Sequence, residues 1–302
     1  SKLRSYRELP IRWAELGTVY RYERPGVMHG LMRVRGFTQD DAHVFCLPDQ
    51  ISDEILLILD LTERILSAFD FSTYEINLST RPEKSIGDDA VWDLATRGLV
   101  EALERKGWSY KIDEGGGAFY GPKIDLKIED AIGRMWQCST IQLDFNLPER
   151  FELEYVAADG SRQRPIMIHR AIFGSLERFF GIMTENYAGD FPFWLAPEQI
   201  RLLPVTDEVQ PYAEQLLKQL KDVGVRATID RSGERLGKLI RIGEQMKIPV
   251  LGVIGAKESE QQSVSLRSRR DGDLGMIAAS QLVEASGRSG RERLAGLELH
   301  PA

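Results

Sequence analysis

The 302-residue sequence predicts an α+β protein with two domains and a short tail. Strand-like segments follow one another in the first part of the chain, which favours an antiparallel sheet with flanking helices. Strands and helices alternate in the second part, which favours a small α/β domain with a largely parallel core. A proline-punctuated segment, 191–197, lies between them, so we expect the domains at 1–196 and 197–288.

Hydrophobic periodicity predicts the elements of the first domain. Two strands, 10–23 and 33–45, are joined by a loop that contains Pro25-Gly26 and His29-Gly30. An amphipathic helix is expected over 49–69, because its apolar residues share one face. The further elements expected are a strand at 74–78, a helix at 89–106 that stops at Gly107, strands at 108–112, 120–128, 134–145 and 151–156, and a helix at 170–187.

The second domain is expected to alternate between the two kinds of element. The expected strands are 200–205, 226–230, 250–254 and 263–268, and the expected helices are 207–222, 236–246 and 279–285. From about Ser286 the chain is rich in Gly, Arg and Glu, which predicts poor order, and we expect 289–302 to be a disordered tail.

Composition indicates a protein of the cytoplasm. The net charge is −7 and 42% of the residues are hydrophobic, with no apolar run near the roughly 18 residues of a membrane span. Only two cysteines, Cys46 and Cys138, are present, so no disulfide framework is expected. An acidic total does not exclude a nucleic-acid partner, because local basic patches decide that. The first residues lack an initiator methionine and an apolar signal segment, so we expect a fragment.

The stretch from Arg21 to His43 carries the most chemical information. Arg21 and Glu23 lie two apart on an expected strand and share a face. A guanidinium suits phosphate oxygens, and a carboxylate could accept the exocyclic amine of adenine. The alternative is a cross-strand ion pair on a solvated face. Further along, Gly174 permits close backbone approach and Arg178 could reach a second phosphate, although a plain helix start explains both residues equally well.

Three further groups could form sites. His43 and His169 could ligate zinc, with Cys138 as a conceivable third ligand, but buried histidines and cysteines are more often structural. Polar residues on alternating strand positions could line a pocket or simply face solvent: Tyr120, Lys123, Gln137, Thr140 and Gln142. Charged residues of the second domain could read bases or form a solvated edge: Arg231, Glu234, Lys238, Glu258, Arg267, Arg269 and Arg270.

Together these segments resemble the threonyl-tRNA synthetases of bacterial type, which are class II aminoacyl-tRNA synthetases. The resemblance covers nearly the whole chain, and its most specific part is the run from His29 to His43. The matching segments are Arg21-Tyr22-Glu23, 29–43, Gly121-Pro122-Lys123, Trp136-Gln137-Cys138, Met167-Ile168-His169-Arg170-Ala171 and Gly174-Ser175-Leu176-Glu177-Arg178. It implies an antiparallel catalytic sheet, a C-terminal anticodon-binding domain, ATP-dependent activation of L-threonine, and transfer to tRNA(Thr).

The resemblance also implies roles for single residues at the ATP end of the site. Arg21 and Arg178 are the catalytic pair, at the α-phosphate and the γ-phosphate, and Mg²⁺ accompanies ATP. Glu23 reads the adenine amine and Phe37 stacks on the ring. The full set implied for ATP is Arg21, Glu23, Arg33, Phe37, Gln137 and Arg178, where Arg33 serves either ATP or the tRNA 3′ end.

The remaining implied roles concern threonine, zinc and the anticodon. His43 and His169 match two of three zinc ligands, and that metal binds threonine through its amino and hydroxyl groups. Such a site rejects valine better than shape alone would. The threonine-binding set is Gln39, Asp41, Tyr120 and Gln142, and the anticodon-binding pair is Glu258 and Arg267.

The sequence also departs from that family. The third zinc ligand, a cysteine in an Asn-Cys-Pro-Gly-His segment, is expected upstream of this chain, as are the dimer-forming motif 1 and the N-terminal domains. We therefore expect weak zinc binding by this chain alone, and a homodimer for the full-length protein. Two alternatives remain open: a non-catalytic synthetase-like protein that binds amino acid or RNA for regulation, and a synthetase for proline or serine.

Overall fold

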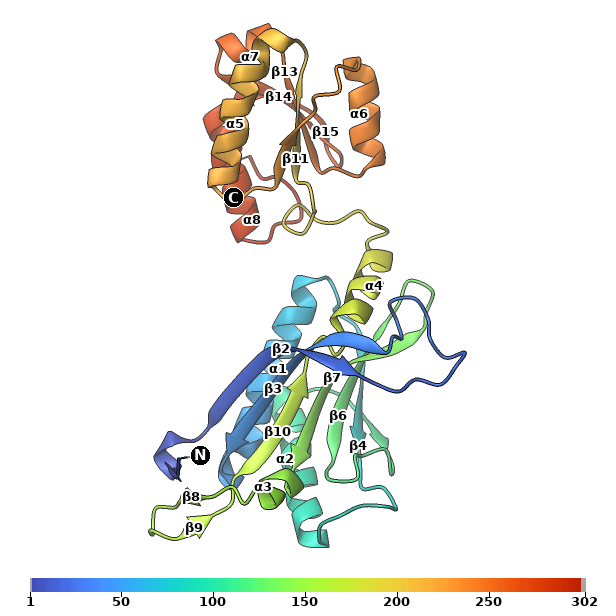
Figure 1. Cartoon of the computed structure of the whole chain (residues 1–302), viewed down its shortest axis with the longest axis vertical. Coiled ribbons are helices and arrows are strands. Elements are labelled where there is room, and N and C mark those ends of the chain that lie inside the picture. Colours follow the sequence, from blue (N-terminus) through green and yellow to red (C-terminus); the bar gives the residue numbers. More distant parts are fainter. Residues whose placement is uncertain (1, 300–302) are drawn as a thin grey trace. The chain divides into compact units, whose positions relative to one another are not determined.

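The computed structural model describes residues 2–299, and these form two compact units, Ser1–Asn186 and Tyr187–Ala302. The first unit is built on a seven-stranded sheet (Figure 1). Its strands are antiparallel except for the last pair, which is parallel. In sheet order they are β2 (Ile11–Tyr20), β3 (Gly36–Cys46), β10 (Ile166–Ala171), β7 (Met135–Asp144), β6 (Lys123–Glu129), β4 (Tyr74–Ser79) and β5 (Lys111–Asp113).

Two long helices cover one face of this sheet, α1 (Ile51–Ala68) and α2 (Asp89–Lys106). Helix α2 begins and ends where local chemistry favours it. The Asp88 side chain caps α2 by accepting from the Val91 N–H, and Gly107 ends it at φ +72°. Alternation along β6 and β7 turns apolar side chains toward the helices and polar ones to the other face. The apolar set on the helix side includes Ile124, Leu126, Ile128, Ile141 and Leu143, all at most 1% exposed.

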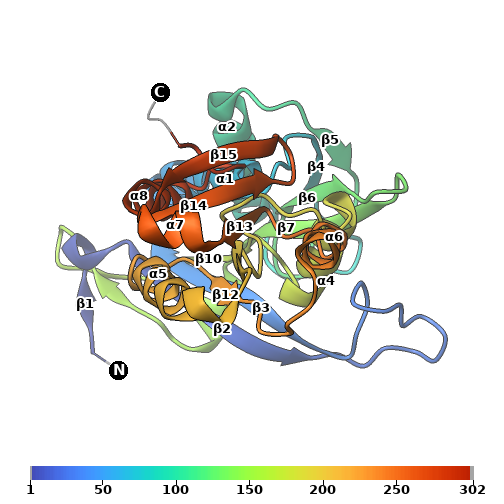
Figure 2. The same ribbon diagram turned by 90° about the horizontal axis from the view of Figure 1, so that it is seen from above.

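The open face of the sheet lies beside a long loop, 21–35, that joins β2 to β3. Figures 1 and 2 both show this loop, in blue, projecting past the ends of the two strands. The chain leaves β10 through a short turn into α4 (Leu176–Asn186). A small separate sheet of β1 (Arg4–Ser5), β8 (Tyr155–Val156) and β9 (Arg162–Gln163), with the short α3 (Asn146–Arg150), completes the unit.

The second unit has a five-stranded sheet between helices. Its order is β12 (Ala227–Ile229), β11 (Ile200–Pro204), β13 (Val250–Ile254), β14 (Ser263–Ser268) and β15 (Gly272–Ala278). The first three strands are parallel, and the last two pair antiparallel. Helices α5 (Gln210–Asp222) and α8 (Ala279–Arg291) pack on one face, α6 (Leu236–Gln245) packs on the other, and α7 (Ala256–Glu260) precedes β14.

The fold class predicted from the sequence is confirmed, although several elements differ from the predictions. The helix expected over 170–187 is wrong at its start, because 170 and 171 end β10 and the helix begins only at Leu176. Gly174, at φ +71°, breaks the segment. In place of the strands expected at 108–112 and 151–156, the structure has the shorter strands β5 (Lys111–Asp113) and β8 (Tyr155–Val156). Strand β15 and helix α7 were not expected, and the core of the second sheet is only partly parallel.

The boundary and the tail also differ from the expected ranges. Phe193 is fully buried in the core of the second unit, and its N–H donates to the Ala295 carbonyl, so the second unit begins before 197. The expected tail is ordered as far as the structure describes it. Helix α8 runs to Arg291, and Leu297 and Leu299 pack against the core of the second unit. The last part of that expected tail, 300–302, lies outside the described residues.

Within residues 2–299, no helix combines the length and the apolar character that a bilayer span requires.

Candidate active site

A row of polar side chains crosses the open face of the first sheet at one level. Gln142 of β7 lies opposite His169 of β10, and His169 lies opposite His43 of β3. Lys123 of β6 extends the row, because it lies opposite Gln142. Since side chains alternate along a strand, Asp41 shares this face with His43. Strand register therefore gathers residues that are up to 126 positions apart in the sequence.

A cleft of about 350 Å³ opens beside this row. It lies where loop 21–35, strand β7 and the start of α4 meet. Its walls contain every residue that the sequence analysis assigned to ATP, together with Gln39. The lining includes Arg21, Glu23, Arg33, Phe37, Gln39, Gln137, Thr140 and Arg178.

Arg178 is the most strongly fixed cation of the cleft. Its Nε donates to the Met32 carbonyl at 2.7 Å and its Nη1 donates to the Gln137 carbonyl at 2.8 Å. The guanidinium also lies 5.4 Å from the ring centre of Trp136. Burial lowers the pKa of Arg178, and the nearby Arg33 and Arg21 act in the same direction. An arginine held this way offers its remaining N–H groups to an anion at no further cost in side-chain entropy.

Arg21 and Phe37 form a second fixed element. The Arg21 guanidinium lies 5.2 Å from the centre of the Phe37 ring, and that ring is only 9% exposed. Arg21 follows the end of β2 and its N–H donates to the Arg35 carbonyl. Both residues lie at the mouth of the loop, so an entering planar ring would meet an aromatic face and a cation together.

Glu23 forms an ion pair with Arg33 across the loop, which agrees with the ion-pair alternative that the sequence left open. Its Oε2 accepts from Arg33 Nε at 3.1 Å, and its carbonyl accepts from Arg35 Nη2 at 3.0 Å. Arg21 is not a partner in this ion pair. A ligand amine that reaches the Glu23 carboxylate therefore has to share it with Arg33 or replace Arg33.

Of the residues expected to bind threonine, only Gln142 belongs to the polar row, and Tyr120 and Asp41 contact members of that row. Tyr120 donates its hydroxyl to Gln142 Oε1 at 2.8 Å, and its ring lies 6.0 Å from that of His169. The structure places Gln39 in the cleft wall, whereas Tyr120 lines a separate cavity with Trp92. Asp41 lies next to this group, with its Oδ2 at 3.9 Å from His43 Nε2.

The two histidines form a close pair. Their ring centres are 4.7 Å apart in an edge-to-face arrangement. His169 Nε2 lies 2.9 Å from Asp144 Oδ2. Burial alone would raise the pKa of Asp144, but hydrogen bonds from His169 and from the Leu147 and Asn146 N–H groups lower it overall. Burial also lowers the pKa of His43, against the opposing effect of Asp41.

The described residues do not complete a metal site by themselves. Zinc in proteins takes at least three protein ligands, whereas no group of three His, Cys, Asp or Glu side chains within residues 2–299 is placed to hold a metal ion. Cys138 is buried, and burial raises the pKa of its thiol to about 12, which opposes the thiolate that zinc needs. The idea that Cys138 is the third ligand is therefore wrong for this structure.

No role was predicted from the sequence for Asp40, whose carboxylate fixes the backbone of the turn before α4. This carboxylate is 7% exposed and accepts from the N–H groups of Ile172, Phe173 and Gly174, all in the turn before α4. Arg170 approaches it at 3.3 Å. Burial raises the pKa of Asp40, with these donors opposing the rise. A local pattern cannot show this role, because the partners lie more than 130 positions away.

Glu177 and Trp136 were also given no role from the sequence. Glu177 accepts from the Thr38 N–H through both oxygens, at 2.9 and 3.0 Å, and so ties α4 to β3. Trp136 lies between Arg134 and Arg178, each 5.4 Å from its ring centre. The dipeptide Glu177-Arg178 was the available signal, although its surface-pair interpretation is not what the structure shows.

The expected anticodon residues lie together in the second unit. Glu258 of α7 accepts from the Gly255 N–H at 2.9 Å and from Ser265 Oγ at 2.7 Å, so it also caps its helix. Arg267 of β14 has a weak ion pair with Glu244 at 3.9 Å, and its buried Nε has no hydrogen-bond partner among the described residues. A free buried donor of this kind suits an external acceptor.

Comparison with known proteins agrees with this geometry. The family model described as the tRNA synthetase class II core domain (G, H, P, S and T) matches residues 1–187. The model described as the anticodon binding domain matches residues 199–286. A solved structure of the RNA-binding domain of threonyl-tRNA synthetase from Cryptosporidium parvum Iowa II is 38% identical, with a TM-score of 0.90 over 98% of this chain and 73% of that one.

The chain belongs to the threonyl-tRNA synthetase family.

Curated relatives within this family are still more similar. Threonine–tRNA ligase from Synechococcus sp. (strain CC9605) is 88% identical over 300 residues, which is 99% of this chain and 49% of that protein. The chloroplastic/mitochondrial threonine–tRNA ligase 2 of Arabidopsis thaliana is 63% identical over 282 residues, which is 93% of this chain and 43% of that protein. The chain thus spans about half the length of the curated relatives it matches. A prolyl-tRNA synthetase structure shares only the fold, at 19% identity and a TM-score of 0.67.

Proposed function

We propose that the protein containing this chain activates L-threonine with ATP and transfers it to the 3′ end of tRNA(Thr). One observation carries the proposal: a single cleft holds two fixed arginines, an aromatic face and a carboxylate, next to a polar row that could hold a small amino acid. Membership of the threonyl-tRNA synthetase family supports the same choice of amino acid. Neither finding favours the non-catalytic alternative or a proline or serine substrate.

The roles proposed for ATP follow from what each side chain offers. Arg21 and Arg178 would neutralise the phosphates during in-line attack by the threonine carboxylate. Phe37 would stack on adenine and Glu23 would accept its amine. Arg33 would be released from Glu23 toward the phosphates or the tRNA end. Such a reaction needs charge neutralisation and positioning rather than a covalent enzyme intermediate, and ATP would enter with Mg²⁺.

The roles proposed for threonine belong to the polar row and to residues beside it. Asp41 would accept from the substrate hydroxyl, and Tyr120 and Gln142, which already share a hydrogen bond, would lie near the amino group. Gln39 would line the passage between the two halves of the site. A site that must satisfy a hydroxyl rejects valine, which lacks one, by about 10,000-fold.

We also propose that His43 and His169 are two ligands of a zinc ion whose third protein ligand lies outside the described residues. Their close approach supports this, as does the Asp144 carboxylate behind His169, because ligating histidines usually have such a partner. When bound, zinc would supply Lewis-acid contacts to the amino and hydroxyl groups of threonine. The side chains described here position the histidines, and Asp144 holds the ring orientation of His169.

This proposal predicts how much metal the present chain carries. Because two imidazoles bind zinc much more weakly than a complete site, we expect well under one zinc per chain after purification without added metal. Elemental analysis measures this directly. A stoichiometric zinc content would show that the chain itself supplies a complete ligand set and would contradict the prediction.

The partners proposed for the full-length protein are tRNA(Thr), ATP and L-threonine, and we propose a cytoplasmic homodimer. Glu258 and Arg267 would read anticodon bases, since the second unit matches an anticodon-binding family model. Replacing Arg267 with Ala should weaken tRNA binding while leaving threonyl-adenylate formation unchanged, because only the second unit is altered.

The deciding experiment is amino-acid-dependent ATP–pyrophosphate exchange by the full-length protein. Threonine should support exchange, valine should fail by about four orders of magnitude, and serine should be intermediate because it keeps the hydroxyl. Calorimetric binding of a threonyl-adenylate analogue to this chain, beside the valyl version, tests the pocket without turnover. Equal exchange with threonine and valine would overturn the proposed substrate, and no exchange with any amino acid would overturn the activity.

A further inference from the structure

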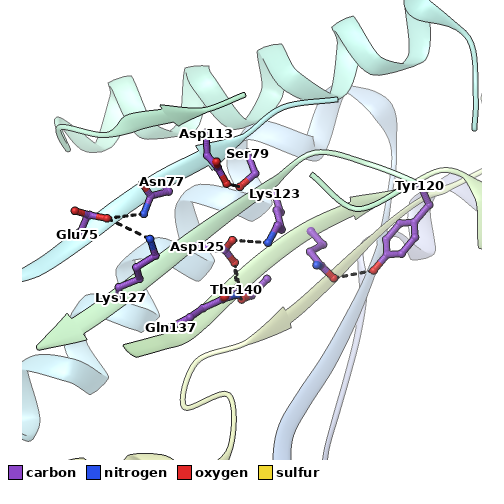
Figure 3. A network of polar contacts seen from close by, with 11 residues as sticks. Glu75, Asn77, Ser79, Asp113, Tyr120, Lys123, Asp125, Lys127, Gln137 and Thr140 are labelled. Carbon is purple, nitrogen blue, oxygen red and sulfur yellow. Dashed lines mark hydrogen bonds and ion pairs between the residues drawn. The ribbon is translucent and has the colours of Figure 1, made fainter. Parts of the chain in front are cut away.

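A buried carboxylate lies next to the cleft proposed for the nucleotide and contacts two of the residues that line it. Asp125, on β6, is 4% exposed although its side chain is on the open face of the sheet. It does not line the cleft itself. Figure 3 shows it at the centre of a polar network with Lys123, Gln137 and Thr140. The sequence analysis gave Asp125 no role, and the proposed mechanism does not use it.

Every oxygen of this carboxylate is engaged. Oδ1 accepts from Gln137 Nε2 at 2.6 Å and from Thr140 Oγ1 at 2.8 Å. Oδ2 pairs with Lys123 Nζ at 2.6 Å, which neutralises the buried charge. Thr140 in turn accepts from the same Gln137 nitrogen at 2.8 Å. A buried charge that is paired and fully hydrogen-bonded restrains its partners strongly.

This arrangement determines which end of the Gln137 amide faces Asp125. An ionised carboxylate can only accept hydrogen bonds, and the single proton of the Thr140 hydroxyl is donated to Asp125. Both hydrogens of the Gln137 NH₂ group are therefore used, one on Asp125 and one on Thr140. The amide cannot flip without bringing its oxygen against a carboxylate, so Oε1 is the end left for the cleft.

We propose that Asp125 is a positioning residue that makes Gln137 present a hydrogen-bond acceptor, rather than a donor, to the bound adenylate. The inference rests on the proposed function and adds a residue to it. The Gln137 backbone carbonyl separately accepts from Arg178, so the same residue is restrained at both ends. Asp125 acts only through these neighbours and does not touch substrate.

An acceptor at this position suits a hydroxyl or ammonium donor of the substrates. The two sources are the ribose 2′-hydroxyl of ATP and the ammonium group of threonine. They are separated by comparing ATP with 2′-deoxy-ATP. If the ribose is the donor, replacing Asp125 should shrink the preference for ATP, whereas an unchanged preference would assign the donor to threonine.

The test is Asp125→Asn in the full-length protein, which keeps the shape of the side chain and removes its charge. An asparagine presents an NH₂ group to one of its neighbours, so the Gln137 amide is free to flip. We expect a loss of about 10- to 100-fold in kcat/KM for threonine-dependent ATP–pyrophosphate exchange, as is usual for groups that orient a ligand-contacting side chain. Thermal unfolding checks that the variant is folded.

A double-mutant cycle separates positioning from a general structural role. If Asp125 acts through Gln137, then Asp125→Asn should cost less than threefold when Gln137 is already alanine. Additive losses would overturn the proposal. Should Asp125→Asn fail to fold, Thr140→Val is the second variant, because it removes the other acceptor of the Gln137 amide. Thr140→Val should lower kcat/KM by several-fold in the wild-type protein. It should have little effect when Gln137 is already alanine.

Glu75→Gln is the matched control. Glu75 belongs to the same polar face and pairs with Lys127 and Lys111, but its contacts do not reach Gln137 (Figure 3). It should change kcat/KM by less than twofold, and an equal effect of both variants would overturn the proposal. Failure of the wild-type protein to catalyse exchange would instead refute the proposed function, so the two failures are distinguishable.

Discussion

At the scale of single residues, the site works by restraining charged groups before any ligand arrives. Arg178 is held by two carbonyl oxygens and an aromatic face, Asp40 by three N–H groups, and Asp125 by three neighbours. Each group is half-buried or buried, where unpaired charges are costly. These side chains are therefore already ordered in the folded protein before a ligand binds.

The fixed geometry of Arg178 leads to a prediction about its chemistry. Arg178→Lys keeps the positive charge but loses the planar fork that binds both carbonyls, so it should lower kcat for threonyl-adenylate formation at least 100-fold, or about 2.7 kcal/mol. Arg134→Lys is the control, because Arg134 also lies against the Trp136 ring but pairs with Asp130 instead. Single-turnover adenylate formation measures both, and similar losses in the two variants would contradict the role of Arg178.

The Asp130 carboxylate should make the free energy of unfolding depend on pH. Burial would raise its pKa, but hydrogen bonds from Trp136 and Arg134 hold it well below its usual range. Its stabilising effect is therefore present above about pH 4, the unfolded value, and is lost as the pH falls toward the lower folded value. Asp130→Asn should lower the free energy of unfolding by about 1–3 kcal/mol at pH 7 and by progressively less as the pH falls below about 4.

Urea unfolding of the chain at several pH values measures this difference. Asp159→Asn serves as the control, since Asp159 caps an exposed turn by accepting from Ser161, and it should change stability by less than about 0.5 kcal/mol. A destabilisation by Asp130→Asn that is the same at pH 3 and pH 7 would contradict the assigned role of the ionised form.

At the scale of elements, the turn between β10 and α4 brings the two halves of the site together. It begins after β10, the strand that carries His169, and leads to Arg178 on α4, and Asp40 fixes its backbone. At Gly174 the turn passes so close to β7 that a Cβ atom would lie 2.4 Å from the Cys138 carbonyl oxygen. The position of α4, and hence of Arg178, depends on this close approach.

Gly174→Ala should therefore disturb both stability and activity. The substitution combines a backbone of φ +71° with a clash against another main-chain atom, so we expect at least a tenfold loss in kcat/KM and a loss of about 1–3 kcal/mol beyond the effect of φ alone. Gly160→Ala measures the cost of a positive φ without a clash, because Gly160 has φ +82° and open space around it. Equal stability of the two variants would show that the clash is relieved without consequence.

The elements also show where sequence reasoning succeeds. Helix α2 was predicted at its observed bounds, because Gly107 is a strong local stop signal. Residues 170–187 were assigned to one helix, although 170 and 171 end β10, because a single glycine is a weak signal for a break. The residues expected to bind ATP were chosen through motifs, and the structure places them in one cleft. Asp40 and Asp125 contact partners that only the fold brings near.

At the scale of the whole chain, two units each have their own core. The second unit includes Phe193 and extends to Leu299, so its core uses residues on both sides of the range 197–288 expected from composition. The proline-punctuated segment 191–197 lies just after the start of the second unit at Tyr187. This segment could not show that the last residues pair with Phe193, because the Phe193 N–H donates to the distant Ala295 carbonyl.

This boundary predicts how fragments behave. A fragment of residues 187–302 should fold alone. A fragment of residues 199–302 should be less stable than it by about 3 kcal/mol or more, because it lacks Phe193, which is fully buried in the core of the second unit. Circular dichroism and urea unfolding of the two fragments measure the difference. Fragments of equal stability would place the true boundary after Phe193.

The row from Lys123 through Gln142 and His169 to His43 has an evolutionary consequence. Each member owes its place to the register of its strand, and a one-residue shift turns a strand's side chains to the opposite face. A single inserted residue in β10 would put His169 among the helix-facing side chains, where Ile168 now lies. Point substitutions can therefore retune this site one contact at a time, whereas we expect changes of length to be tolerated only in loops such as 157–161.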